Sequence, residues 1–208
     1  MGWIRFESLT WQSVPMPYSS GPVRLARLPL SGPAFLAFVR FPAGWSRPEP
    51  VVYQAAEEFV ILEGDLRIND HHWKARSYGC VPAHHTRGIT ESTAGCLAWA
   101  RFHGSPKPFK AGPSTGERPS DIVQVNLDTL IGGTRDYTLY RSLAGETRFT
   151  PLFDIREVLH SERARYDALA FDDSSWWADG APAEPEPGGS TLPVGQPAIV
   201  HRTSETPR

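Results

Sequence analysis

With 208 residues, of which 40% are hydrophobic and 21% charged, the chain suits one large globular domain or two small ones. Its 21 Lys and Arg balance 23 Asp and Glu, so the net charge of −2 gives no electrostatic basis for binding nucleic acid or an anionic membrane. The longest apolar run, Ala34 to Val39, is too short to cross a bilayer, and Arg5 and Glu7 argue against a secretory signal. We therefore expect a cytoplasmic protein.

Twenty prolines and eighteen glycines divide the chain into short segments, which favours strands and turns over helices. Five segments are rich in aromatic and β-branched residues and are either alternating or continuously apolar, as strands are. They are residues 23–30, 35–41, 58–62, 77–81 and 96–102. Short strands at this spacing predict an all-β sandwich or barrel.

The pattern partly restarts after residue 120, because residues 133–141 repeat the glycine-then-strand arrangement of residues 21–27. The repeat predicts strands at 133–153 and 190–201. Leu159, Arg163 and Tyr166 are spaced for one face of a helix over residues 155–170. We expect two domains, a barrel in residues 1–120 and, in residues 121–208, a degenerate second half or an extension packed on the barrel.

The two cysteines, Cys80 and Cys96, are too few for a disulfide scaffold and lack the C-x-x-C spacing of a redox or zinc motif. A fold-back of the chain near Gly88 would let them face each other across strands. In a reducing cytosol we expect free, buried thiols.

The most informative stretch runs from Phe41 to Gly104. It contains a Pro-Ala-Gly turn at residues 42–44, the run Glu-Glu-Phe-Val-Ile-Leu-Glu-Gly at 57–64 and the cluster Val-Pro-Ala-His-His at 81–85. This arrangement resembles the two motifs of the cupin superfamily: a glycine, an H-x-H pair, a glutamate and a glycine, then a Pro-Gly turn and a third histidine. The resemblance implies an antiparallel double-stranded β-helix barrel. The alternative is a chain that folds into two cupin-like halves.

The first motif departs from the family pattern at both histidines. Counting back from Gly64 places Glu57 at the glutamate position and Val51 and Tyr53 at the histidine positions. A longer spacing would give residues 50 and 52, but 51, 53 and 57 share strand parity and would face one interior.

The second motif departs as well, because counting from Pro82 places Arg87 at the third histidine position, just after His84 and His85. A Zn, Fe or Mn site needs three or four imidazole, carboxylate or thiolate ligands, and Glu57 with one histidine does not reach that number. We therefore expect no cofactor. The alternative is a divalent metal bound by Glu57, His84 and His85 with a further ligand.

The remaining polar groups suggest acid–base chemistry. Glu57, a carboxylic acid inside an apolar barrel, is the candidate general base or acid, with Tyr53 and His85 as its catalytic partners. Arg40 and Arg101 would hold a substrate carboxylate if they point inward. The alternatives are arginines on the solvated outer face, and a salt bridge between Glu57 and one of them. The other residues predicted to bind substrate are Val51, Phe59, Tyr78, Arg87 and Trp99.

These inferences predict a metal-independent enzyme acting on a small organic substrate by proton transfer, as an isomerase, cyclase or lyase of a biosynthetic pathway. Two alternatives remain, a metal-dependent cupin oxygenase and a barrel that binds a ligand or is purely structural. We expect neither nucleic acid nor membrane as a partner, and a homodimer is left open.

Overall fold

The computed structural model describes the chain in segments with gaps between them. These segments are residues 3–28, 30, 34–112, 122–142, 145–154, 164–170, 175–177 and 194–204. Apart from two one-turn 3-10 helices, η1 (Phe6–Ser8) and η3 (Leu127–Thr129), their regular structure is β-strand, which confirms the predicted all-β class. In these segments no helix has the length and apolar character that a membrane span requires.

The chain divides into two compact units, residues 10–128 and residues 1–9 with 129–208. These boundaries differ from the expected 1–120 and 121–208 because strands pair across the sequence. Strand β1 (Trp3–Arg5) pairs with β17 (Ser175–Trp177), near the other end of the chain. Strand β13 (Val123–Asn126) pairs with β9 (Ser77–Val81) and so belongs to the barrel unit.

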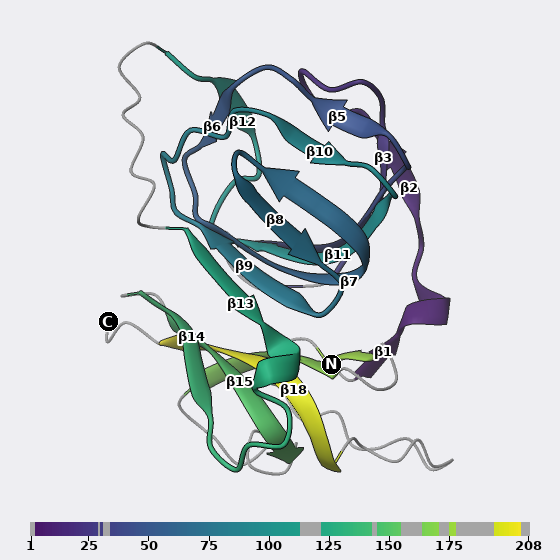
Figure 1. Cartoon of the computed structure of the whole chain (residues 1–208). Coiled ribbons are helices and arrows are strands. Elements are labelled where there is room, and N and C mark those ends of the chain that lie inside the picture. The colour runs from purple at the N-terminus through teal and green to yellow at the C-terminus, as the bar shows by residue number, and fades with distance from the viewer. Residues whose placement is uncertain are drawn as a thin grey trace. The chain divides into compact units, whose positions relative to one another are not determined.

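The barrel unit is built from short antiparallel strands that curl around a common interior (Figure 1). Its main sheet has the order β13-β9-β7-β11-β4-β3-β2, and β10 pairs with both β5 and β7. The strands not yet bounded are β2 (Gln12–Val14), β3 (Val23–Arg27), β4 (Phe35–Phe41), β5 (Trp45–Arg47), β6 (Val51–Tyr53), β7 (Glu57–Ile68), β8 (His71–Lys74), β10 (Thr90–Ser92), β11 (Cys96–Phe102) and β12 (Pro108–Lys110).

Strand β7 organises this unit because it changes partners along its length. Its first part pairs with β9 and β11, and its second part with β8 and β10. Gly64 marks the change, with a φ of +74°, and the register of β11 shifts nearby, between Leu97 and Ala98. The resulting bend lets one strand belong to two walls of the barrel.

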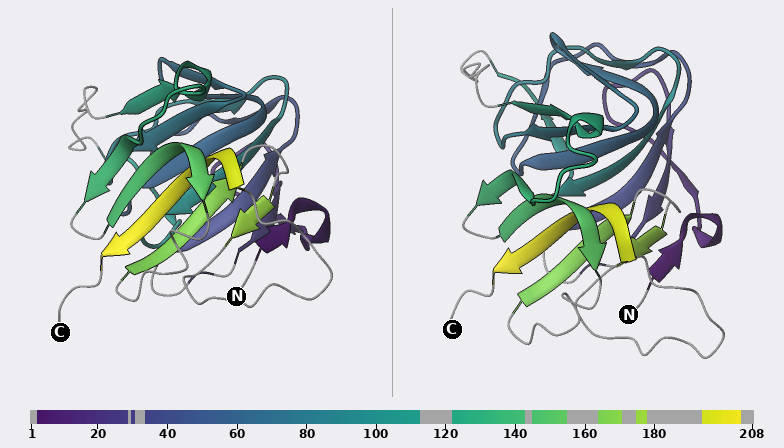
Figure 2. Two further views of the ribbon diagram at one scale, coloured as in Figure 1. Left: turned by 90° about the horizontal axis from the view of Figure 1, so that it is seen from below. Right: turned by 60° about the horizontal axis from the view of Figure 1, so that its bottom comes forward.

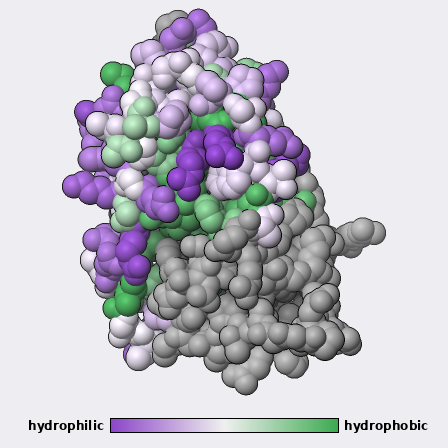
Figure 3. All heavy atoms as spheres, turned by 90° about the vertical axis from the view of Figure 1, so that its right-hand side faces the viewer, coloured by the Kyte–Doolittle hydropathy of each residue, from purple (hydrophilic) through white to green (hydrophobic). Residues whose placement is uncertain are grey.

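Large apolar side chains line the interior of the barrel unit. The core includes Phe59, Ile61, Trp73 and Val81, which are at most 1% exposed. On the face in Figure 3, polar side chains surround a smaller apolar area of the described surface. The alternation of apolar and polar residues that predicted strands thus separates inside from outside.

The second unit is a six-stranded antiparallel sheet of order β1-β17-β16-β18-β15-β14 (Figure 2). The strands first bounded here are β14 (Tyr137–Ser142), β15 (Gly145–Asp154), β16 (Ala164–Ala170) and β18 (Val194–Ser204). The helix predicted over residues 155–170 is wrong for residues 164–170, which form β16 and pair with β18; residues 155–163 lie outside the described residues. A second cupin-like half stays a prediction.

Both cysteines are free and buried, in β9 and β11. Cys80 lies opposite Glu58 of β7 and Cys96 opposite Gly64, six residues further along that strand. Six residues of strand span about 20 Å, far beyond the reach of a disulfide. Burial raises the pKa of the Cys96 thiol to about 12, and that of Cys80 also rises.

Replacing Gly64 with alanine should destabilise the barrel strongly. A Cβ atom there would lie 1.8 Å from the carbonyl oxygen of Gly95, in addition to the strain of a positive φ. The matched control is Gly44→Ala, since Gly44 has a φ of +73° but open space around it. In urea denaturation we expect a loss of about 1 kcal/mol for Gly44→Ala and at least twice that for Gly64→Ala. Equal losses would contradict this account of the bend.

Candidate binding and catalytic site in the barrel

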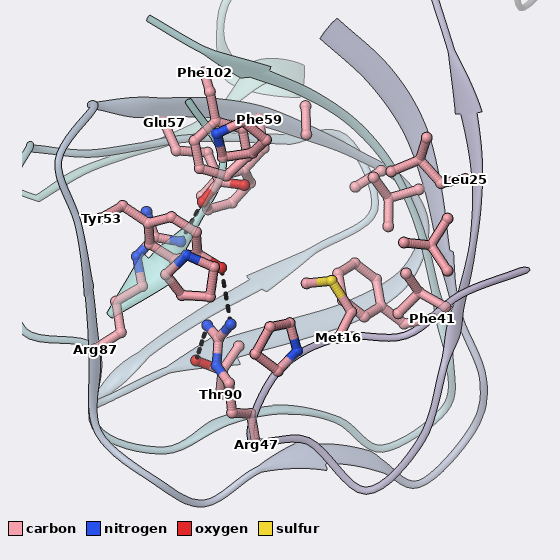
Figure 4. Close-up of a pocket in the computed structure, with 18 of the residues that line it drawn as sticks. Met16, Leu25, Phe41, Arg47, Tyr53, Glu57, Phe59, Arg87, Thr90 and Phe102 are labelled. Atoms are coloured by element: carbon pink, nitrogen blue, oxygen red, sulfur yellow. Dashed lines mark hydrogen bonds and ion pairs between the residues drawn. The ribbon is translucent and has the colours of Figure 1, made fainter. Parts of the chain in front are cut away.

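The barrel unit contains a cavity of about 410 Å³, within the size range of small-molecule sites. Most of its wall is apolar and comes from β2, β3, β4, β7 and β11. The polar side chains gather on one side, and Leu25, Phe41 and Met16 lie on the other (Figure 4). The cavity therefore has a polar end and an apolar end.

An ion pair between Arg87 and Glu57 forms the centre of the polar end. Nη1 of Arg87 donates to Oε2 of Glu57, and the two side chains are only 3% and 13% exposed. The guanidinium carbon of Arg87 also lies 4.5 Å from the ring centroid of Tyr53, a cation–π contact. Arg87 thus holds the carboxylate and packs on the phenol at once.

A second arginine, Arg47 of β5, completes this end. Its Nη1 donates to the hydroxyl of Tyr53 at 2.8 Å, and its Nη2 donates to Oγ1 of Thr90 at 3.4 Å. Arg47 is 2% exposed, so its charge lies inside the barrel. The sequence analysis missed Arg47 and Thr90. The available signal was the alternation in β5, where Trp45 and Arg47 are buried and Ser46 between them is not.

Backbone pairing brings the polar residues together. Val51 and Arg87 exchange two backbone hydrogen bonds, of 2.9 and 2.8 Å, in an isolated antiparallel bridge. The amide of His84 donates to the carbonyl of Tyr53 at 2.8 Å, which ties the 81–87 turn to β6. The positions that the resemblance assigns to metal ligands, 51, 53, 57 and 87, therefore lie side by side.

Of the predicted site residues, Glu57, Tyr53, Phe59 and Arg87 line the cavity. Val51 is fully buried in a cluster with Tyr53 and Phe102, next to the site. The catalytic and binding roles assigned to these residues stay predictions.

Four residues predicted to bind substrate lie elsewhere, because strand parity turns them outward. Ala98, Ala100 and Phe102 line the cavity, so Trp99 and Arg101, which alternate with them, face away from it. The side chain of Arg40 is 43% exposed and forms an ion pair of 3.6 Å with Glu63, in place of an inward position. The hydroxyl of Tyr78 donates at 2.7 Å to Glu58, which also alternates with the cavity-lining residues of β7. The arginines that line the cavity are Arg47 and Arg87, in place of the expected Arg40 and Arg101.

The two histidines of the 81–85 cluster also lie away from the cavity lining. His84 is exposed, with a backbone φ of +63°, and His85 is buried beside the turn at Pro82. The alternative metal site of Glu57, His84 and His85 is therefore not assembled. Across the described segments, no three His, Cys, Asp or Glu side chains are grouped as metal ligands.

The residues at the polar end do not fit a divalent metal. The carboxylate of Glu57 is paired with Arg87, and the oxygen of Tyr53 accepts a hydrogen bond from Arg47. A metal ion bound to these two oxygens would lie next to two guanidinium groups, which repel it. At this end of the described barrel, the buried side-chain atoms without a hydrogen-bond partner include Nε of Arg47 and Nε and Nη2 of Arg87. These atoms are donors, and donors suit an anion or a carbonyl oxygen.

Comparisons with known proteins agree on the architecture. No protein-family model and no curated protein sequence matches the chain. A putative dioxygenase from Nostoc punctiforme PCC 73102 is similar in structure, with a TM-score of 0.65 and 15% identity over 99% of this chain and 87% of that one. Protein Ylba from E. coli is similar with a TM-score of 0.55 and 8% identity over 97% and 89% of the two chains. A putative acetylacetone dioxygenase from Methylibium petroleiphilum PM1 covers 55% of this chain and 83% of its own, with a TM-score of 0.46 and 19% identity.

At these identities the similarity establishes the fold. The names of these similar proteins give no support to the isomerase, cyclase or lyase expected from the sequence, nor to the expectation that no cofactor is needed. The curled antiparallel strands of residues 10–128 and the similarity over nearly the whole chain together show a cupin-type fold.

Proposed function

We propose that the barrel cavity is the active site of an enzyme that moves a proton on a small organic molecule, with Glu57 as the proton acceptor and without a transition metal. The observation that carries the proposal is the position of Glu57. It is the one carboxylate among the described residues that line a mostly apolar cavity, and Arg87 fixes its orientation. A positioned carboxylate facing a small-molecule cavity is the arrangement that general base catalysis needs.

Tyr53 supplies the complementary group. Its oxygen accepts a hydrogen bond from Arg47, so its own O–H is available to donate to a substrate oxygen in the cavity. The positive charge of Arg47 behind the phenol favours negative charge developing on that oxygen. Base and oxyanion donor thus belong to one connected group of side chains.

The reaction class that fits these groups is proton abstraction beside a carbonyl. Glu57 takes a proton from the carbon, and the electron pair of that C–H bond moves to the carbonyl oxygen, where Tyr53 donates to it. Return of the proton to another atom of the conjugated system gives an isomer. Loss of a leaving group from the next carbon gives an elimination product.

Glu57→Gln should abolish this chemistry while preserving the fold, because glutamine has nearly the same shape and does not accept a proton. The measurement needs no knowledge of the substrate. The protein is incubated with a pooled microbial metabolite extract in D₂O, and deuterium incorporation is followed by mass spectrometry. We expect enzyme-dependent exchange in some compounds, reduced about 100-fold or more in Glu57→Gln.

The matched control for this experiment is Glu63→Gln, since Glu63 is an exposed glutamate of the same strand that pairs with Arg40. It should exchange at the wild-type rate. Thermal denaturation of each variant verifies folding. Exchange that persists in a folded Glu57→Gln protein would overturn the role of Glu57.

A metal-dependent dioxygenase is the second candidate, favoured by the similarity to the putative dioxygenase from Nostoc punctiforme. Metal content distinguishes the two. Because guanidinium groups occupy the polar end, we expect elemental analysis of purified protein to find zinc, iron and manganese well below one ion per chain, and EDTA to leave the melting temperature unchanged. A stoichiometric metal that disappears on mutation of His85 or Glu57 to alanine would favour the dioxygenase.

A further inference from the structure

We infer that the barrel cavity binds an uncharged, mainly hydrocarbon molecule with a hydroxyl group, and that Oε1 of Glu57 accepts the hydrogen bond of that hydroxyl. The inference rests on the proposed function for its location and adds the chemical class of the ligand. Three observations lead to it: the state of the two Glu57 oxygens, the apolar wall of the cavity and the charges at its polar end.

The two carboxylate oxygens of Glu57 differ in their surroundings. Oε2 accepts a hydrogen bond from Nη1 of Arg87. Oε1 accepts none from the residues that the structure describes, and it is not one of the buried side-chain atoms that lack a partner, so it has accessible surface. The side chain is 13% exposed and lies on the cavity wall (Figure 4). A molecule in the cavity can therefore contact Oε1.

This accessible oxygen requires a hydrogen-bond donor on the ligand. In the free protein, water can donate to an accessible carboxylate oxygen. A ligand that fills the cavity displaces that water, and an ionised acceptor left without a donor is costly. The ligand must therefore supply a donor of its own. A hydroxyl does so with a single polar atom, whereas an amide brings a further polar group against an apolar wall.

The rest of the cavity favours a hydrocarbon body on this hydroxyl. Opposite the polar end, the wall contains Met16, Leu25 and Phe41 (Figure 4), which pack against the core of the barrel. These three side chains are only partly buried, so they present apolar surface to a ligand. Covering that surface with hydrocarbon removes it from water, which stabilises the complex.

The charges at the polar end disfavour an ionised ligand. A carboxylate would lie against the like charge of Glu57. The partnerless nitrogens of Arg47 and Arg87 are buried, so they do not reach a ligand to offset this repulsion. The further cation of the described wall, Lys107, is exposed, where an ion pair contributes little. An ammonium group would lie near two buried guanidinium groups that are balanced by one carboxylate on the described wall. A neutral hydroxyl meets neither repulsion.

Four probes of similar length test the inference by isothermal titration calorimetry at neutral pH: 1-octanol, heptyl methyl ether, octanoate and octylammonium. The ether is an isomer of octanol that accepts hydrogen bonds but donates none. Because the hydroxyl donates to a charged oxygen, we expect octanol to bind about tenfold more tightly than the ether, and both ions to bind more weakly than octanol. Equal affinities for octanol and the ether, or tighter binding of either ion than of octanol, would overturn the inference.

Glu57→Gln assigns the hydrogen bond to Oε1. Arg87 donates, so it holds the amide oxygen of the glutamine, and the accessible position then carries an NH₂ donor in place of an acceptor. We expect the preference for octanol to fall from about tenfold to near equality with the ether. The matched control Glu63→Gln, an exposed glutamate of the same strand, should keep the full preference. Retention of that preference in a Glu57→Gln protein shown to be folded by thermal denaturation would contradict the assignment.

Met16→Gln tests the hydrocarbon part of the ligand. Glutamine has a similar length and places a polar amide in the apolar wall, so octanol and the ether should both bind about threefold or more weakly, with the preference between them unchanged. The matched control is Ile89→Gln, because Ile89 is 54% exposed and lies outside the cavity lining. Unchanged affinities in Met16→Gln would show that the ligand does not contact this wall.

Binding and deuterium exchange together separate this inference from the proposed function, because binding of the probes requires no proton transfer. A preference for octanol that depends on Glu57, without Glu57-dependent exchange, would sustain the hydroxyl site and overturn the proposed reaction. Glu57-dependent exchange without a preference for octanol over the ether would do the reverse.

Discussion

Arg87 and Glu57 are 30 residues apart in the sequence, and their ion pair joins the start of β7 to the segment before β10. Removing two charges from water costs several kcal/mol for each ion, and the pair offsets part of that cost when its geometry is fixed. The backbone bridge to Val51 fixes the position of Arg87. The Tyr53 ring then packs on the guanidinium, and Arg47 bonds to the Tyr53 hydroxyl. Tyr53 is thus held by this pair directly, and Arg47 is held through Tyr53.

The fixed position of Arg87 also explains why two of its donors, Nε and Nη2, have no hydrogen-bond partner in the described structure. An exposed arginine would satisfy them with water, but Arg87 is 3% exposed and its side chain is held by Glu57 and Tyr53. The fixed position of Arg87 thus leaves two donors of a buried cation without a hydrogen-bond partner.

The sequence was sufficient for the fold and for half of the site, for identifiable reasons. The spacing from Gly64 predicted that Glu57 and Tyr53 face one interior, and both line the cavity, because parity along a strand is a local property. Arg40 and Arg101 were considered as inward residues, although the alternation of Ala98, Ala100 and Phe102 with larger neighbours turns them outward. Parity alone does not tell which of two apolar faces is the interior when both are buried, as in β11.

Other features depend on contacts between distant residues and had no local signal. The pairing of β1 with β17 moves the domain boundary, and the pairing of β16 with β18 overrides a helical spacing. The Arg87–Glu57 pair belongs to the same category. The sequence analysis named both partners, Glu57 as the candidate catalytic group and Arg87 as the residue at a histidine position, but it did not predict a pairing between the two.

The position of Arg87 explains how a barrel of this fold can keep a cation at the centre of its site without three imidazoles. A metal ion is bound through ligands that must be deprotonated, so its occupancy depends on pH and on the supply of metal. A guanidinium is part of the chain, stays charged at all physiological pH values and presents its donors in one plane. It offers no open coordination position, so it can attract and orient an anion or an oxyanion but does not exchange ligands. Such a site suits the proposed reaction, in which charge is stabilised and Glu57 moves a proton.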